Sequence, residues 1–276
     1  MNKCIHHRSV IDDGRLKDIL YSTVSSMERT GYRLYDWRAR APDPSGGWQR
    51  RNQRTYATPS RSWVSLKKKY GWIFCGAAII SDRWMLTAAY CVERLKPSDF
   101  IALVGTISRI RGGTIYEINK VISHKAYNKP YKFDNDIAVI STKKTIEFNE
   151  NVQPLPLPKK NIQSGLSCIV SGWGYLNNQL YSDKLKYLYV ETLTSEQCSR
   201  ILSNGRSSTV ILPLHMCTLS KRGQGTCLSD AGSSLVCNGT SAGIVSYNFP
   251  CALGKPDLYS NTYIYNTWIK QNTKSP

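Results

Sequence analysis

Short apolar stretches separated by turn-forming residues dominate the chain from about residue 61 onward. They are rich in β-branched and aromatic residues, too short for typical helices, and bounded by glycine, proline, asparagine, aspartate or serine. Such a pattern predicts strands, and many short strands of even spacing predict an all-β fold built from barrels. The expected strands are residues 64–66, 77–80, 101–104, 115–121, 137–140, 168–171, 185–190, 234–237 and 242–247.

Residues 1–60 follow a different pattern. Apolar residues recur at helical spacing between Asp13 and Gly31, which predicts a short amphipathic helix that begins at a capping residue and ends at a glycine. From Arg38 to Arg61 the chain is rich in proline, glycine and arginine, as is typical of a linker. We therefore expect an N-terminal extension of unknown role over residues 1–60 and one domain over residues 61–276.

The composition indicates an extracellular domain. Of nine cysteines, eight lie between Cys75 and Cys251, which is typical of a disulfide-bonded protein from an oxidising compartment. No run of apolar residues approaches the length of a membrane span, and no apolar run follows the basic opening residues as in a signal peptide. Cys4 is left over, either as a free thiol or for an intermolecular bridge.

The formal net charge of +18 is large for 276 residues. Residues 1–60 contribute +5 (11 basic, 6 acidic) and residues 61–276 contribute +13 (26 basic, 13 acidic). The charge would allow a polyanion as a partner, but the charges come in short groups such as Lys67-Lys68-Lys69, which are more typical of a solvated basic surface. No nucleic-acid-binding motif accompanies them, so we expect no specific nucleic acid partner.

Three motifs carry chemical information. Residues 227–237 read C-L-S-D-A-G-S-S-L-V-C, residues 86–91 read L-T-A-A-Y-C, and residues 135–139 read N-D-I-A-V. These closely resemble the three catalytic motifs of the chymotrypsin-like (trypsin-family) serine proteases. The resemblance places Ala231 at the nucleophilic serine, Tyr90 at the general-base histidine and Asp136 at the orienting aspartate.

The resemblance runs from Trp63 to about Lys270 and implies a specific architecture. The family has two six-stranded antiparallel β-barrels with the cleft between them, and a C-terminal helix, here over about residues 263–270. The family disulfides would be Cys75–Cys91, Cys168–Cys237, Cys198–Cys217 and Cys227–Cys251.

The resemblance also locates the specificity pocket. Gly225 stands at the pocket base, where trypsins have an aspartate, while Ser246 and Asn248 belong to the wall strand, with Asn248 narrowing the entrance. Asp257 occupies a pocket-lining glycine position. A glycine base with an aspartate at that position is similar to insect chymotrypsins, and Asp257 is interpreted as an inherited pocket residue in preference to a working cation site.

Several features predict that catalysis is lost. An alanine methyl cannot attack a carbonyl, and a phenol is a poor general base at neutral pH; we expect Tyr90 to fill the space of the missing groups. By the resemblance, the main-chain N–H groups of Ser229 and Ala231 stand at the oxyanion position. Ser229 stands where the family has a glycine, and its side chain disfavours the backbone conformation required there. The family's I-V-G-G activation terminus is absent from residues 46–51, so Asp230 has to find another donor, become protonated, or leave the loop in a zymogen-like arrangement.

The sequence therefore favours a secreted, non-catalytic serine protease homologue. It would bind proteases, protease inhibitors or cascade zymogens, as a decoy or regulator in an immune or venom cascade. Two alternatives remain open: a serine endopeptidase of chymotrypsin-like specificity, and a polyanion-binding module. No cofactor is expected, the histidines show no metal-ligand spacing, and Asn238-Gly239-Thr240 is a glycosylation sequon.

Overall fold

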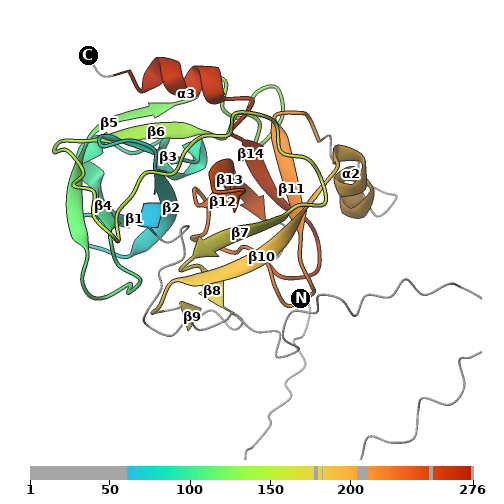
Figure 1. Ribbon diagram of the computed structural model, residues 1–276, viewed down its shortest axis with the longest axis horizontal. Coiled ribbons are helices and arrows are strands. Elements are labelled where there is room, and N and C mark those ends of the chain that lie inside the picture. The colour runs from blue at the N-terminus through green and yellow to red at the C-terminus, as the bar shows by residue number, and fades with distance from the viewer. Residues whose placement is uncertain (1–60, 177–179, 182, 204–210, 249–250, 275–276) are drawn as a thin grey trace, which may run out of the picture. The chain divides into compact units, whose positions relative to one another are not determined.

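The computed structural model describes residues 61–276 except 177–179, 182, 204–210, 249–250 and 275–276 (Figure 1). The chain divides into two compact units, Met1–Gly46 and Gly47–Pro276, and every described residue belongs to the second. The helix expected after Asp13 and the linker-like segment up to residue 60 lie outside the described residues.

The first six strands close into an antiparallel barrel in the order β1-β2-β3-β6-β5-β4. Closure pairs each strand on both sides, so this barrel has no exposed sheet edge. The strands are β1 (Trp63–Lys68), β2 (Ile73–Ile79), β3 (Trp84–Thr87), β4 (Phe100–Val104), β5 (Thr114–Ser123) and β6 (Ala138–Thr142).

A second closed antiparallel barrel follows, in the order β10-β11-β14-β13-β12-β7, beside the first (Figure 1). Its strands are β7 (Ser167–Gly172), β10 (Lys186–Leu193), β11 (His215–Leu219), β12 (Ser234–Cys237), β13 (Thr240–Asn248) and β14 (Asp257–Asn261). A two-stranded sheet of β8 (Tyr175–Leu176) and β9 (Leu180–Tyr181) completes the strands among the described residues. The expected pair of six-stranded barrels is confirmed.

Helices are short and lie outside the barrels. They are α1 (Ala89–Val92), η3 (Pro97–Asp99), α2 (Ser195–Ser203) and α3 (Asn266–Asn272). The C-terminal helix α3 is confirmed, but it begins at Asn266 and not at residue 263. The strand pattern did not predict α2. In the described part of the chain no helix is long and apolar enough to cross a membrane.

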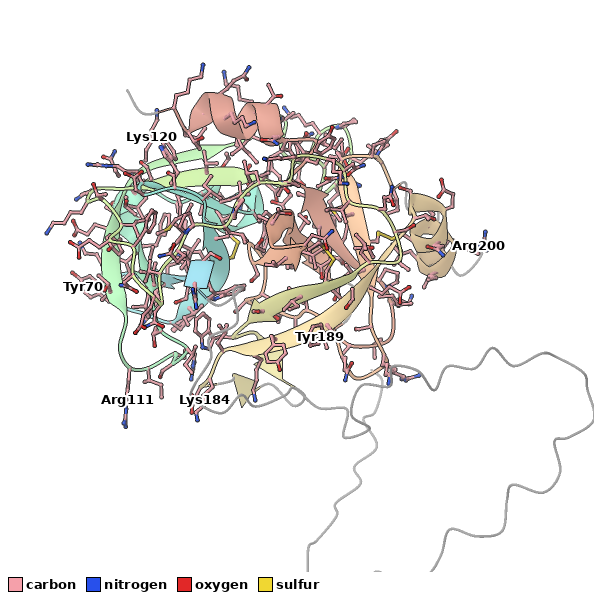
Figure 2. All side chains as sticks on the ribbon, in the orientation of Figure 1. Tyr70, Arg111, Lys120, Lys184, Tyr189 and Arg200 are labelled. Atoms are coloured by element: carbon pink, nitrogen blue, oxygen red, sulfur yellow. A yellow bond between two sulfur atoms is a disulfide. The ribbon has the colours of Figure 1, made fainter. Side chains whose placement is uncertain are left out.

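The alternation along β5 shows why these sequences form barrel strands. Tyr116 and Ile118 point inward and are buried, whereas Glu117 and Asn119 are exposed. The register shifts between Ile118 and Lys120, so Lys120 also faces solvent. Figure 2 shows Lys120 at the outside of the first barrel. Period-two burial of this kind leaves one face of the strand for the core and the other for solvent.

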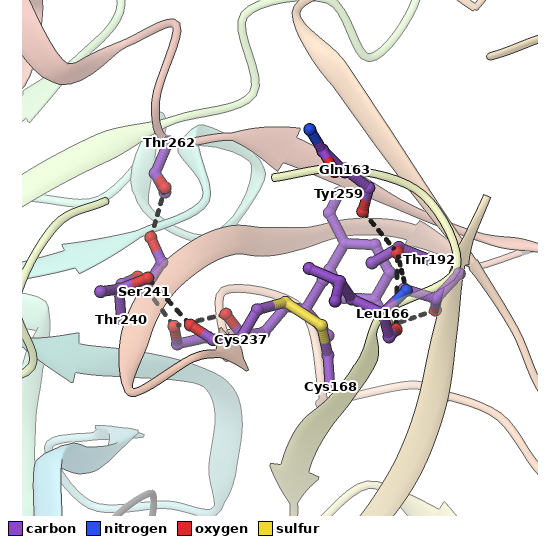
Figure 3. Close-up of a disulfide and its surroundings, with 12 residues drawn as sticks. Gln163, Leu166, Cys168, Thr192, Cys237, Thr240, Ser241, Tyr259 and Thr262 are labelled. Atoms are coloured by element: carbon purple, nitrogen blue, oxygen red, sulfur yellow. Dashed lines mark hydrogen bonds between the residues drawn. A yellow bond between two sulfur atoms is a disulfide. The ribbon is translucent and has the colours of Figure 1, made fainter. Parts of the chain in front are cut away.

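The four disulfides implied by the family resemblance are all present: Cys75–Cys91, Cys168–Cys237, Cys198–Cys217 and Cys227–Cys251. Cys168–Cys237 joins β7 to the end of β12 in the core of the second barrel (Figure 3). Around it, the Thr240 hydroxyl donates to the carbonyl of Cys237 at 2.9 Å and the Thr192 hydroxyl donates to the carbonyl of Gln163 at 2.8 Å. Buried hydroxyls thus satisfy main-chain acceptors that the strand ladders leave open.

Hydrogen bonds from the second barrel converge on Asp136, two residues before β6. The Ser260 hydroxyl donates to the main-chain carbonyl of Asp136 at 2.7 Å, and the Ser246 hydroxyl donates to its carboxylate at 2.6 Å. In the opposite direction, the N–H of Gly76 in β2 donates to the carbonyl of Ala231 at 2.8 Å. The junction of the barrels is therefore where the predicted site residues meet.

Candidate active site

Asp136 is fully buried at this junction. Its Oδ1 accepts a hydrogen bond from the main-chain N–H of Tyr90 at 2.7 Å, and its Oδ2 accepts the Ser246 hydroxyl at 2.6 Å. Burial raises the pKa of Asp136 to about 6, against the lowering effect of these hydrogen bonds. The carboxylate is held in a fixed orientation, and Ser246, which the sequence assigned only to the pocket wall, is one of the groups that hold it.

Tyr90 does not fill the space between the barrels. Its side chain is 62% exposed, although its main chain in α1 is fixed by Asp136 and by the neighbouring Cys75–Cys91 disulfide. The expectation that the phenol packs into the site is wrong, because α1 directs the ring toward solvent.

Ala231 lies almost buried between the barrels, with 9% of its surface exposed. Its carbonyl accepts the N–H of Gly76, and a Cβ added to the following Gly232 would lie 3.3 Å from the sulfur of Cys91. The turn is thus packed against the disulfide next to Tyr90. The side chain it presents is a methyl group, with no hydroxyl to attack a carbonyl and no proton to exchange with a base.

Ser229 adopts the left-handed backbone conformation with φ 71°. The sequence predicts that a side chain disfavours this glycine-like conformation, and Ser229 nevertheless adopts it. The turn enforces it, with the N–H of Asp230 donating to the carbonyl of Cys227 at 3.0 Å. Within the described part of the chain, neither the N–H of Ser229 nor that of Ala231 donates to a protein acceptor. Two main-chain donors thus remain open beside the Ala231 methyl group.

We expect Ser229→Gly to raise the free energy of unfolding by about 1 kcal/mol, because a left-handed conformation costs a residue with a Cβ about that much. Ser167→Gly is the matched control: Ser167 is exposed in β7 and has no positive φ, so this change should lower stability. Chemical denaturation of both variants measures the difference. Equal losses in the two variants would mean that Ser229 carries no backbone strain.

Asp230 is buried and accepts two main-chain hydrogen bonds. Its Oδ1 accepts the N–H of Gly174 and its Oδ2 accepts the N–H of Cys227, both at 2.9 Å. Among the described residues no lysine, arginine or histidine forms an ion pair with it. Burial raises its pKa to about 6, opposed by the two hydrogen bonds. Of the three alternatives expected for Asp230, which were another donor, protonation or a zymogen-like loop, the structure shows the first, with two main-chain donors.

Two residues predicted to line the pocket, Gly225 at its base and Asp257, lie next to each other. A Cβ added to Gly225 would lie 3.4 Å from Oδ2 of Asp257, and the same oxygen accepts the N–H of Thr226 at 2.8 Å. Asp257 is 6% exposed, and burial raises its pKa to about 7. Asn248 pairs with Asp257 across β13 and β14, but its side chain, expected to narrow the entrance, lies outside what the structure describes.

The pKa of Asp257 predicts a pH dependence of stability. The pKa of Asp257 in the folded protein is above the ordinary value of about 3.9, so the folded protein binds this proton more tightly than the unfolded chain does. Protonation of Asp257 therefore stabilises the fold fully below about pH 4, and this stabilisation is lost as the pH rises to about 7. Over this range Asp257 should lower the free energy of unfolding of the wild type by up to about 4 kcal/mol. Asp257→Asn, whose side-chain oxygen can still accept the Thr226 N–H, should remove this part of the pH dependence.

Urea unfolding of wild type and Asp257→Asn at intervals from pH 4 to pH 8 measures the effect. Subtracting the two curves cancels the groups that do not interact with Asp257, such as Asp136, so the difference reports Asp257 together with Asp230, whose charge also raises the pKa of Asp257. Parallel curves over the whole range would show that Asp257 does not titrate in this window.

A buried pair next to the site was not predicted. Nε2 of His215 lies 3.2 Å from Oδ1 of Asp134, with side-chain exposures of 3% and 1%. The atoms are within ion-pair distance but are not aligned as a hydrogen bond, so the contact is electrostatic. Burial lowers the pKa of His215, against the raising effect of Asp134. The pair connects the loop before Asp136 to β11. Its two residues are 81 positions apart in the sequence, so no local pattern predicts the contact.

Two further expectations concern groups away from this site. Asn238 is exposed in the Asn238–Gly239 turn between β12 and β13, with φ 49°, so the sequon is accessible and its glycosylation stays a prediction. In the described residues no three histidines, cysteines, aspartates or glutamates are placed to hold a metal ion.

Two closed barrels with these motifs at their junction define a chymotrypsin-like fold. A family model described as Trypsin matches residues 49–269, and the chain belongs to this family.

Relatives and a solved structure agree with this assignment. The chain is 33% identical to Chymotrypsin-2 of Vespa crabro over 72% of this chain and 88% of the relative. It is 34% identical to a trypsin of Xenopus laevis over 74% of this chain and 82% of that protein. Mouse neuropsin, described as a serine protease expressed in the limbic system of the brain, superposes with a TM-score of 0.70 at 27% identity, covering 80% of this chain and 97% of the neuropsin chain.

Proposed function

We propose that this protein is a secreted, non-catalytic member of the trypsin family that binds a polypeptide across Ala231, as a decoy or regulator in a proteolytic cascade. One observation carries the proposal: a methyl group stands beside the open N–H groups of Ser229 and Ala231, where the family has its nucleophile. The turn can receive a peptide carbonyl but holds no atom that attacks it. Residues 61–276 would form the binding domain and residues 1–60 an extension.

The base position supports the same conclusion. A neutral phenol is a poor general base at neutral pH. Tyr90 is also 62% exposed, so its hydroxyl is not held against Ala231. Asp136 keeps its two hydrogen bonds but has no imidazole to orient.

The relatives favour a second candidate, a serine endopeptidase of chymotrypsin-like specificity, because they are named chymotrypsin and trypsin. The two candidates differ in one property, which is turnover. Hydrolysis that copurifies with the protein and disappears in Asp136→Ala would decide for the enzyme.

The partners we propose are proteases, protease inhibitors or cascade zymogens. Such proteins present extended loops that lie against open main-chain donors, as substrates do. The juxtaposition of Gly225 and Asp257 supports a pocket of insect-chymotrypsin type. The four disulfides fit an extracellular protein, in which such partners occur.

Calorimetric titration of the full chain with a tight-binding, substrate-like protein inhibitor of chymotrypsins tests the proposal. Such inhibitors bind mainly by surface complementarity, so a formed cleft should give one-to-one binding without cleavage. The control is the same inhibitor saturated with active chymotrypsin, whose loop is covered and should give no heat. No binding by the free inhibitor would mean that the cleft is not formed.

A further inference from the structure

The turn between β12 and β13 carries the sequence Asn238-Gly239-Thr240, the only Asn-X-Ser/Thr sequence in the chain. Asn238 and Gly239 are exposed, and a Cβ added to Gly239 would meet no atom within 4 Å. Within the part of the chain that the structure describes, the side-chain amide of Asn238 forms no hydrogen bond. The turn therefore has room for a large polar group on the amide nitrogen of Asn238.

Asparagine in this pattern is the acceptor for an N-linked glycan, whose donor is a lipid-linked oligosaccharide diphosphate. In the transfer, the amide nitrogen of the asparagine forms a bond to C1 of the first sugar. The bond between C1 and the diphosphate oxygen breaks, its electron pair stays on the diphosphate, and the amide gives up one proton. The transferase recognises the asparagine amide and the hydroxyl of the third residue together, so both groups have to be free at that moment.

The folded turn does not present these two groups together. Cys237 pairs with Thr240 across the two strands, and the Thr240 hydroxyl donates to the main-chain carbonyl of Cys237 at 2.9 Å (Figure 3). The two residues between them, Asn238 and Gly239, both adopt left-handed conformations, with φ of 49° and 72°. A two-residue turn of this kind is among the tightest hairpin connections. The sequon is thus exposed to water, but its hydroxyl is not available to an enzyme.

A disulfide fixes the residue that precedes the turn. Cys237 is bonded to Cys168 in β7, and both residues are buried in the core of the second barrel. β12 is also hydrogen-bonded to β7 on one side and to β13 on the other. Freeing the Thr240 hydroxyl requires the end of β12 to separate from β13, and the bond to Cys168 opposes this separation.

The order of synthesis leaves an interval before the disulfide forms and the barrel closes. Cys168 precedes Cys237 by 69 residues, so it is already present when Cys237 is made. β14, which pairs with β13 and β11 to complete the barrel, ends at Asn261, and synthesis from Asn238 to that residue takes roughly 1 to 5 s. Disulfides form in seconds to hours. Sugar transfer and closure therefore compete on similar timescales.

We infer that Asn238 receives an N-linked glycan while the second barrel is still open, and that closure of the Cys168–Cys237 disulfide ends the reaction. The inference does not rest on the proposed function. Asn238 follows the last residue of β12, whereas Ala231 precedes its first, so the glycan is attached beyond the opposite end of this strand from the candidate site. The glycan covers the exposed end of the second barrel and leaves the site at Ala231 open.

Two preparations of the unglycosylated full chain test the order of events. One is oxidised, with its four disulfides formed, and the other is reduced and alkylated, which unfolds it. Each is incubated with purified oligosaccharyltransferase and a lipid-linked oligosaccharide, and the sugar is detected by the mass it adds to the peptide that contains Asn238. The reduced chain should be modified at least about tenfold faster, because the turn of the folded chain must first open. Asn238→Gln and Thr240→Ala should abolish this modification, and Thr240→Ser should retain it.

Two variants test the part played by the disulfide in the same assay. Cys168→Ala/Cys237→Ala in its folded form should be modified faster than the oxidised wild type, because β12 is no longer bonded to β7. Cys198→Ala/Cys217→Ala is the matched control, since it removes the bond between α2 and β11 of the same barrel and should be modified as slowly as the wild type. Resistance to protease digestion identifies the folded fraction of each variant.

The full chain secreted from eukaryotic cells behind a cleavable signal peptide should carry the sugar at Asn238. Secreted chain without it, or a reduced chain that the transferase leaves unmodified, would overturn the assignment of the site. Equal rates for the oxidised and reduced chains would overturn the order of events, because the glycan could then be added to the closed barrel. None of these results bears on the binding of an inhibitor at Ala231.

Discussion

The double variant Tyr90→His/Ala231→Ser is expected to hydrolyse peptide thioesters at least about 10³-fold faster than the wild-type chain, which should be inert. The triad acts as a unit worth on the order of 10⁶ in turnover, so either single change should leave the rate at the wild-type level. The remaining parts are in place: Asp136 is anchored by Ser246 and by the main chain of residue 90, and the N–H groups of residues 229 and 231 are open.

The measurement is steady-state hydrolysis of a thioester panel with aromatic, aliphatic and basic side chains, which also tests the chymotrypsin-type pocket proposed from Gly225 and Asp257. Adding Asp136→Asn to the double variant should return the rate to background, because the imidazole then loses its orienting charge. A wild-type chain that turns over the panel as fast as the double variant would refute the proposed loss of catalysis.

Gly174→Ala is expected to lower the free energy of unfolding by about 3 to 5 kcal/mol. An added Cβ would lie 2.3 Å from Oδ2 and 2.4 Å from Cγ of Asp230, and the displaced carboxylate would lose the N–H of Gly174. Asp230 is 3% exposed, so water cannot replace the lost hydrogen bond to its carboxylate.

Gly71→Ala is the control for this change. Gly71 is exposed, and an added Cβ would meet Cβ and Cγ of the flexible Lys68 side chain at 3.1 and 3.9 Å, so the loss should stay below about 1 kcal/mol. Urea unfolding of both variants gives the comparison. If Gly174→Ala were as stable as Gly71→Ala, Asp230 would not be confined as the structure describes.

The sequence predicted the elements that local patterns encode. Short β-rich runs between turn residues predicted nine of the strands, whereas β3, β8, β9, β11 and β14 were not among those expected. The resemblance of the motifs to the family located Tyr90, Asp136 and Ala231 and the disulfide partners. Both kinds of signal depend on residues close together in the chain or on a family pattern. The helix α2 (Ser195–Ser203) was missed because it is short, so only two of its residues, Cys198 and Leu202, are buried.

What the sequence could not supply depends on distant residues or on backbone geometry. The contact of His215 with Asp134 joins segments that only the closed barrels bring together. The left-handed Ser229 follows from the turn around it, which overrides the preference of a serine. Tyr90 is exposed because of the direction of α1, a property that residue size does not reveal.

The methyl group of Ala231 has a kinetic consequence for any complex formed there. An active protease ends its encounter with a substrate by cleaving it, so one molecule processes many and the outcome grows with time. A turn without a nucleophile releases its partner only by dissociation, unaltered. Its influence would then depend on the molar ratio of the two proteins and on residence time, and would be reversed by dilution.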